Sequence, residues 1–156
     1  MVDQTLNPTP LPHGKLAPSF SLVSSSGQTI TRSQFRGKQA LAVIFFEPTP
    51  EAWALLDAVS GDAAEYAELN ARVIGIAHVD RQDLSISADS PVLVLADPQG
   101  TVWKAYSGTD TPGYGVFVLD VYGGVDDQRV AAHVADLPVA SQILQWTRSA
   151  QYRCNI

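Results

Sequence analysis

The sequence of 156 residues contains a single cysteine, Cys154, near its C-terminal end. One cysteine cannot form an internal disulfide, a Cys-x-x-Cys redox pair or a cysteine-based zinc or iron–sulfur site. This count excludes most of the thiol redox chemistry that a chain performs by itself. Arg153 next to Cys154 could lower the pKa of a reactive thiol, but an incidental thiol near the terminus is the simpler interpretation.

Other signals are missing as well. No apolar run is long enough to span a membrane, and the first residues lack the apolar core of a secretory signal. Ten basic residues against sixteen acidic ones give a net charge of −6, which disfavours nucleic acid and anionic membrane as partners. We therefore expect a cytoplasmic protein with no nucleic-acid or membrane partner.

The sequence also has no pattern typical of a metal or cofactor site. His13, His78 and His133 are scattered along the chain, and the stretch GTDTPGYG lacks the lysine and the spacing of a phosphate-binding loop. We expect no metal and no cofactor.

The length is that of one domain with a core of its own. Prolines at positions 8, 10 and 12 predict a flexible Pro-rich arm over residues 1–13, followed by a single domain over residues 14–156. Hydrophobic patterns and turn signals predict a series of elements. They are a hairpin around residues 24–27, buried strands over 40–46 and 72–79, a helix over 51–70 interrupted at Gly61, a turn over 97–100, a hairpin turning at 122–124, and a C-terminal helix over 137–152.

The junction between the first buried strand and the following helix, FFEPTPEAW, contains Glu47 and Pro48 and then a helix-start pattern. Thr49 suits the N-cap, Pro50 the first helical position, and Glu51 the first turn, where a carboxylate suits the helix dipole. These roles explain each residue without a ligand, and we favour them. The alternative is that free backbone N–H groups at this helix start bind a polar ligand.

Polar residues also follow the ends of the buried strands. If the two strands are parallel neighbours, Glu47, Thr49, His78, Asp80 and Tyr114 should meet at one edge of the sheet, where ligands of open α/β sheets tend to bind. His78 beside a carboxylate could act as a base, although capping of a strand end is the simpler role. An open polar pocket here would favour ligand binding. If the Trp53 and Tyr114 side chains instead occupy that space, the loop has a purely structural role.

Four phrases carry a resemblance to a known family. In chain order they are GKLAPSFSLVSSSGQTITRSQFRGKQALAVIFF, VIGIAHVD, VLVLADPQGTVWKAYSG and VFVLDVYGGV. They resemble the peroxiredoxin (AhpC/TSA) branch of the thioredoxin-like superfamily over roughly residues 14–150. The resemblance implies an α/β thioredoxin-like fold, a central mixed β-sheet flanked by helices, with an N-terminal β-hairpin. The family activity that it implies is that of a thiol-dependent peroxidase or antioxidant oxidoreductase.

The sequence departs from that family where its chemistry lies. Peroxiredoxins carry Pro-x-x-x-Thr/Ser-x-x-Cys after the first central strand. Two registers place that cysteine on Ala54 or Leu55, and the thioredoxin pattern places its two cysteines on Pro50 and Trp53. Three residues before Phe117, where peroxiredoxins often have an arginine, stands Tyr114.

We therefore expect a peroxiredoxin-like protein with a degenerate active site, redox-inactive and acting as a binding or interaction module for an unknown protein or small molecule. Two alternatives stay open. One is a thiol-dependent peroxidase that uses Cys154, and the other is a non-redox enzyme at the sheet edge near His78. By analogy with the fold group we also expect a homodimer.

Overall fold

A computed structural model describes residues 9–84 and 91–153. Its strands are β1 (Ser21–Ser24), β2 (Thr29–Thr31), β3 (Ala40–Phe46), β4 (Ala71–Ala77), β5 (Leu93–Ala96), β6 (Tyr114–Leu119) and β7 (Val125–Ala131). Its helices are α1 (Pro50–Ser60), α2 (Ala63–Glu68), α3 (Thr101–Ser107) and α4 (Ala140–Arg153), with short 3-10 turns η2 (Arg32–Gln34), η3 (Arg81–Asp83) and η4 (Val134–Asp136). Cys154 lies outside the described residues, as does most of the predicted N-terminal arm.

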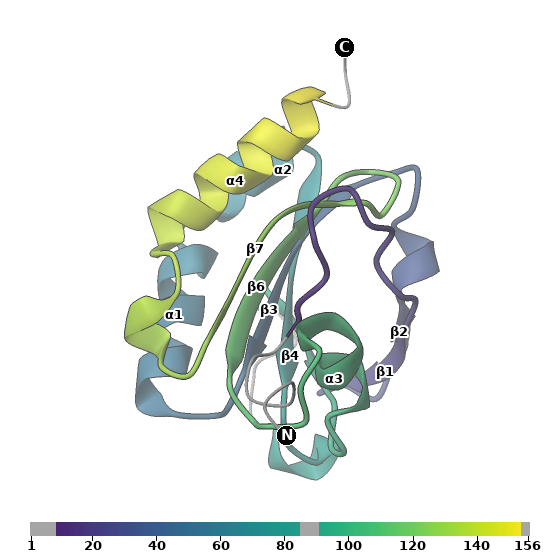
Figure 1. Ribbon diagram of the computed structural model, residues 1–156. Helices are drawn as coiled ribbons and strands as arrows, with labels where there is room; N and C mark the ends of the chain where they lie inside the picture. The colour runs from purple at the N-terminus through teal and green to yellow at the C-terminus, as the bar shows by residue number, and fades with distance from the viewer. Residues whose placement is uncertain (1–8, 85–90, 154–156) are drawn as a thin grey trace.

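The strands form one mixed sheet in the order β2-β1-β5-β4-β3-β6-β7. The central strands β3, β4 and β5 are parallel, and the hairpins β1–β2 and β6–β7 add antiparallel strands on either side. Helices α1, α2 and α4 lie on one face of the sheet, and α3 lies on the other (Figure 1). The predicted mixed sheet with flanking helices and an N-terminal β-hairpin is confirmed.

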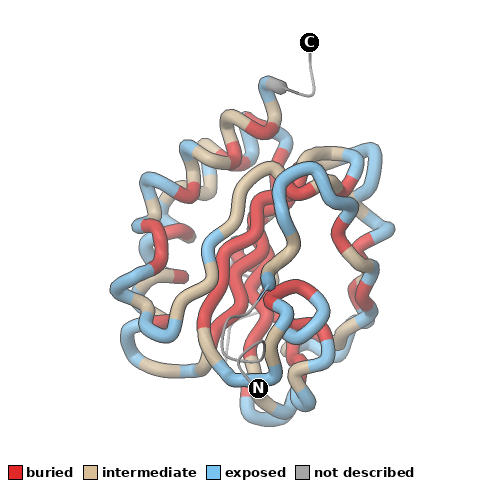
Figure 2. The backbone as a smooth tube through the Cα atoms, viewed as in Figure 1, coloured by how far each residue is buried: buried red, intermediate tan, exposed pale blue. Residues whose placement is uncertain are grey.

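The central strand β3 is apolar throughout because both of its faces are covered. All seven of its residues are buried, and the buried colour continues across the neighbouring strands in Figure 2. Side chains alternate between the two faces of a strand. Ala42, Ile44 and Phe46 join the core beneath α1 and α4, whereas Val43 and Phe45 join the core beneath α3. A strand covered on both faces must be apolar at every position.

Local signals place most of the other elements where they were predicted. Gly61 ends α1 before α2 begins at Ala63, so the interrupted helix is confirmed. The hairpin turn between β6 and β7 is held by Asp120, whose Oδ1 accepts hydrogen bonds from the backbone N–H groups of Tyr122 and Gly124 at 2.9 and 3.0 Å.

The prediction that the second buried strand continues to residue 79 is wrong. Strand β4 ends at Ala77, because the N–H of Val79 turns back to the Ala77 carbonyl at 2.9 Å. His78 therefore lies just past the strand end rather than inside the sheet. None of the helices in residues 9–84 and 91–153 combines the length and apolar character needed to cross a bilayer.

The start of the described chain lies against the body of the protein. The N–H of Leu11 donates to the Tyr106 carbonyl at 3.0 Å, and His13 Nδ1 lies 2.8 Å from the Asp126 carbonyl oxygen. Leu11 also packs, partly buried, against the core beneath α3. These contacts anchor the segment that immediately precedes β1.

Candidate functional site

The three parallel strands end together at one edge of the sheet. Phe46 of β3 is aligned with Ala77 of β4, and Ala77 is aligned with Ala96 of β5. The residues that follow these ends are Glu47, His78 and Asp97, and antiparallel β6 begins at the same edge with Tyr114. The carboxyl ends of parallel strands are where open α/β sheets place their ligand sites.

The helix start at this edge is capped as the sequence predicts. Thr49 has extended backbone angles, its Oγ1 accepts from the Ala52 N–H at 3.2 Å, and its carbonyl accepts from the Trp53 N–H at 3.0 Å. Pro50, at the first helical position, has no N–H to donate. In the described structure the Glu51 N–H is therefore the only donor of the first four helical residues without a protein acceptor.

A histidine and a carboxylate pair at the strand ends. His78 Nδ1 lies 2.7 Å from Glu47 Oε2, and the two side chains are 35% and 29% exposed. The His78 backbone N–H also donates to the Phe46 carbonyl at 3.1 Å, which holds the residue beside the end of β3. A carboxylate at one ring nitrogen orients an imidazole and leaves the other nitrogen free to exchange a proton.

Beside this pair is a cavity of about 10 Å³, roughly the space of one water molecule. Its floor is Trp103, which is fixed at three points: its backbone N–H donates to Asp97 Oδ2 at 3.0 Å, its Nε1 donates to the Thr111 carbonyl at 2.9 Å, and its ring packs 5.6 Å from that of Phe45. A Cβ atom on Gly115 would lie 3.0 Å from the Trp103 ring, so the glycine makes room for the indole.

A larger open groove lies next to the helix start and has a volume of about 420 Å³. The residues that line it are Thr49, Glu51, Tyr114, His133, Val134 and Ala135. His133 was not predicted at this site. Tyr114 is aligned with Ala131 at the end of β7, so the chain that leaves β7 passes the groove two residues later. Aligning the two arms of the β6–β7 hairpin residue by residue would have placed His133 near Tyr114.

Among the described residues that line the groove and the cavity, none is basic apart from histidine. Their charged or titratable lining residues are Glu47, Glu51, His78, Asp97 and His133, together with Tyr114. Among residues 9–84 and 91–153 no group of three His, Cys, Asp or Glu side chains is placed to hold a metal ion. The site therefore offers mostly hydrogen-bond acceptors and negative charge.

Residues 13–128 match the model of the AhpC/TSA family, which is about three quarters of the chain. The chain belongs to the AhpC/TSA family. No curated protein matches the sequence significantly.

Solved structures of this family and its superfamily share the fold. Peroxidoxin BcpB from Mycobacterium tuberculosis superposes with a TM-score of 0.75 at 19% identity, covering 92% of this chain and 97% of that one. A reduced 2-Cys peroxiredoxin from Plasmodium vivax gives 0.74 at 17% identity, covering 95% and 85%. A putative thiol:disulfide interchange protein DsbE from Chlorobium tepidum gives 0.68 at 20% identity, covering 90% and 99%. At these identities the likeness establishes the thioredoxin-like fold.

In this AhpC/TSA-family chain the positions counted for the family's cysteine hold alanine and leucine. Ala54 is exposed on α1, and Leu55 packs against the core. Trp53 does not fill the groove, because its ring packs edge-on against Phe46 with a centroid distance of 5.0 Å. Asp80 is exposed and precedes η3, and it lines neither the groove nor the small cavity.

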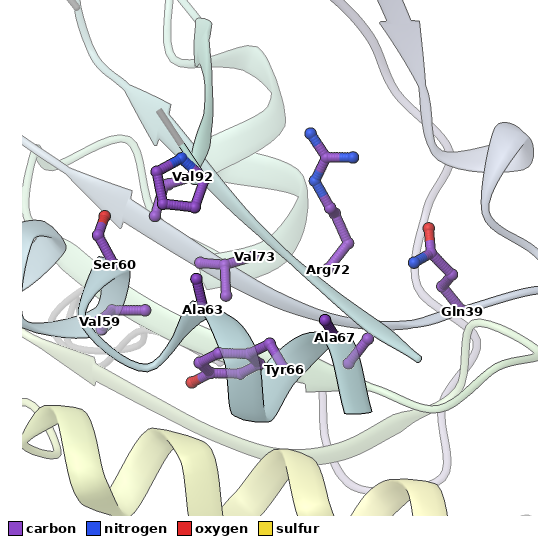
Figure 3. A pocket seen from close by; sticks show the side chains of 11 residues that line it. Gln39, Val59, Ser60, Ala63, Tyr66, Ala67, Arg72, Val73 and Val92 are labelled. Atoms are coloured by element: carbon purple, nitrogen blue, oxygen red, sulfur yellow. The ribbon is translucent and has the colours of Figure 1, made fainter. Parts of the chain in front are cut away.

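Another cavity of about 220 Å³ lies at the opposite end of the sheet, between α2 and the start of β4 (Figure 3). Its walls are mostly small and apolar, with Val59, Ala63 and Val73 facing one another. The Arg72 guanidinium extends away from the Tyr66 ring in Figure 3. Burial raises the pKa of the Tyr66 hydroxyl, as it does that of Tyr106. Neither tyrosine lines the groove.

Proposed function

We propose that this AhpC/TSA-family protein does not reduce peroxides and instead binds a ligand in the groove between the start of α1 and His133. One observation carries the proposal: the positions counted for the family's cysteine hold the methyl group of Ala54 and the core-packed Leu55. Peroxide reduction needs a thiolate nucleophile activated by a cationic neighbour. In the part of the chain that the structure describes, neither lysine nor arginine lines this groove.

The size and chemistry of the groove support a binding role. Small-molecule sites are clefts of about 300–1,000 Å³ that combine apolar walls with a few polar groups, and the groove has about 420 Å³. Val134 and Ala135 supply apolar surface, and Thr49, Glu51 and Tyr114 supply polar atoms. Trp53 leaves this space open by packing against Phe46.

The test is a hydrogen peroxide consumption assay on the purified protein with a thiol reductant, run beside the Cys154→Ser variant. We expect both proteins to consume peroxide no faster than the buffer with reductant. Thiol-dependent turnover by the wild type at a peroxiredoxin-like rate would contradict the proposal. If that turnover were then lost in Cys154→Ser, the alternative of a Cys154-dependent peroxidase would replace it.

The hydrogen bond between His78 and Glu47 favours a second candidate, non-redox acid–base catalysis at the sheet edge. At 2.7 Å the carboxylate can orient the imidazole. The measurement is hydrolysis of a generic activated ester by the wild type, His78→Asn and Glu47→Gln. A rate that is equal in all three proteins would rule this candidate out.

We also propose that the protein is a homodimer, on the basis of fold-group analogy. Light scattering measures the mass in solution directly. A mass equal to the 16.7 kDa of a single chain would contradict this proposal.

A further inference from the structure

We propose that the groove beside α1 binds a small organic cation, a protonated amine or an amidinium or guanidinium group on a compact apolar body. The inference rests on the proposed function and specifies the chemical class of its ligand. Three features of the groove carry it: an unpaired tyrosine hydroxyl, a helix start with little capacity for anions, and an unneutralised carboxylate.

Tyr114 supplies the first feature. The residue is only 9% exposed and lines the groove, and no hydrogen bond joins its hydroxyl to another residue of the described chain. The hydroxyl is not among the fully enclosed polar groups that lack a partner, so it retains some contact with solvent. A solvent-accessible hydroxyl on a residue that lines the groove is free to hydrogen-bond to a ligand.

The helix start supplies the second feature. A helix N-terminus usually attracts anions through its free N–H groups. Here Pro50 has no N–H, the Ala52 and Trp53 N–H groups are bonded to Thr49, and Glu51 alone retains a free one. The Glu51 carboxylate on the same residue opposes the approach of an anion. The usual anion site at a helix start is therefore largely removed.

The third feature is the charge of the groove lining. Glu51 is exposed and has no salt-bridge partner in the parts of the chain that the structure describes. Ionised carboxylates only accept hydrogen bonds, and the Thr49 hydroxyl, whose oxygen accepts from Ala52, can still donate one. An amidinium has several N–H donors and suits both Glu51 and the Tyr114 oxygen.

The experiment compares two probes of nearly the same size and opposite charge, benzamidine and benzoate. Amide chemical shifts of the ¹⁵N-labelled full chain are followed during titration with each probe in low salt. We expect benzamidine to bind with a dissociation constant on the order of 1 mM, typical of a fragment. The shifts should concentrate on Thr49, Glu51, Tyr114 and Val134, and added salt should weaken the binding.

Two conservative variants test the named contacts. Glu51→Gln removes the charge, Tyr114→Phe removes the hydroxyl, and Glu68→Gln, at an exposed position of α2, is the matched control. We expect each groove variant to weaken benzamidine binding about threefold to tenfold and Glu68→Gln to leave it unchanged. Circular dichroism of each variant checks that the fold is kept.

The remaining outcomes separate this inference from the proposed function. Benzoate binding in the groove as tightly as benzamidine would overturn the cation inference and leave the binding role standing. No binding of benzamidine at millimolar concentration, or equal binding by wild type and Glu51→Gln, would also overturn it. Only thiol-dependent peroxide turnover by the protein would contradict the proposed function itself.

Discussion

Placing a cysteine at Ala54, one of the positions counted for the family's nucleophile, should not create a reactive thiol. Ala54 is the fifth residue of α1, beyond the first turn where the helix dipole lowers a thiol pKa. Glu51 is three residues earlier and Asp57 three residues later, and both carboxylates therefore neighbour the new side chain on the helix surface. The variant is Ala54→Cys in the Cys154→Ser background, so that the protein carries a single thiol.

The size of the effect follows from these neighbours. An unperturbed thiol has a pKa of about 8.5, and a like charge one turn away on a helix costs about 0.2–0.5 kcal/mol. Two such neighbours together correspond to about 0.3–0.7 pKa units. We therefore expect a thiol pKa of about 8.8–9.2 and a thiolate fraction of only about 1% at neutral pH.

The assay is the ultraviolet absorbance of the thiolate, measured as a function of pH. Ala105→Cys in the same background is the matched control, because Ala105 is exposed on α3 with no charged residue three or four positions away. Adding both Glu51→Gln and Asp57→Asn to Ala54→Cys should return the pKa to that of the control. A pKa below about 7 for Ala54→Cys would refute the reasoning, since only an activating environment produces such a value.

Three further predictions concern stability, measured by chemical denaturation. Asp97→Ala should lower the free energy of unfolding by about 1–2 kcal/mol, because the buried Asp97 carboxylate accepts from two backbone N–H groups at the start of α3; an unchanged value would contradict this role. The free energy of unfolding should fall as the pH rises above about 10, by about 1.4 kcal/mol per pH unit for each buried tyrosine. Burial raises the pKa of Tyr66 and Tyr106, so the unfolded chain loses these tyrosine protons at a lower pH than the folded protein does. Tyr66→Phe should reduce that slope, and an identical slope would argue against it. Arg32→Met should leave the free energy of unfolding unchanged or raise it by about 1–2 kcal/mol. The reason is that Arg32 is only 6% exposed and its Nε and Nη1 have no hydrogen-bond partner in the described chain. A clear loss of stability would contradict this expectation.

The elements that could be predicted are those whose causes are local in sequence. The run ALAVIFF must be a strand covered on both faces, because every residue in it is apolar. The start of α1 was predicted to the residue, because a threonine cap, a proline and a glutamate act within a single turn. Gly61 interrupts the helix for an equally local reason.

The candidate site was predicted only in part. The rule that parallel strands end at one edge correctly places Glu47 and His78 together. It does not separate Asp80 from them, because the chain turns at Val79 and carries Asp80 into the start of η3. The role of His133 depends on the alignment of β6 with β7, which no local pattern of polar residues reveals.

By itself, the sequence determined what this protein lacks and how its segments begin and end. A single cysteine, a helix start capped by Thr49 with Pro50 at its first position, and a central strand without polar residues follow from residue identity and short-range physics. The tertiary structure alone decided that His133 joins Thr49 and Tyr114 around one open groove and that Trp53 leaves it open. These residues are far apart in the chain, and only the hydrogen-bond register of β3, β6 and β7 brings them together.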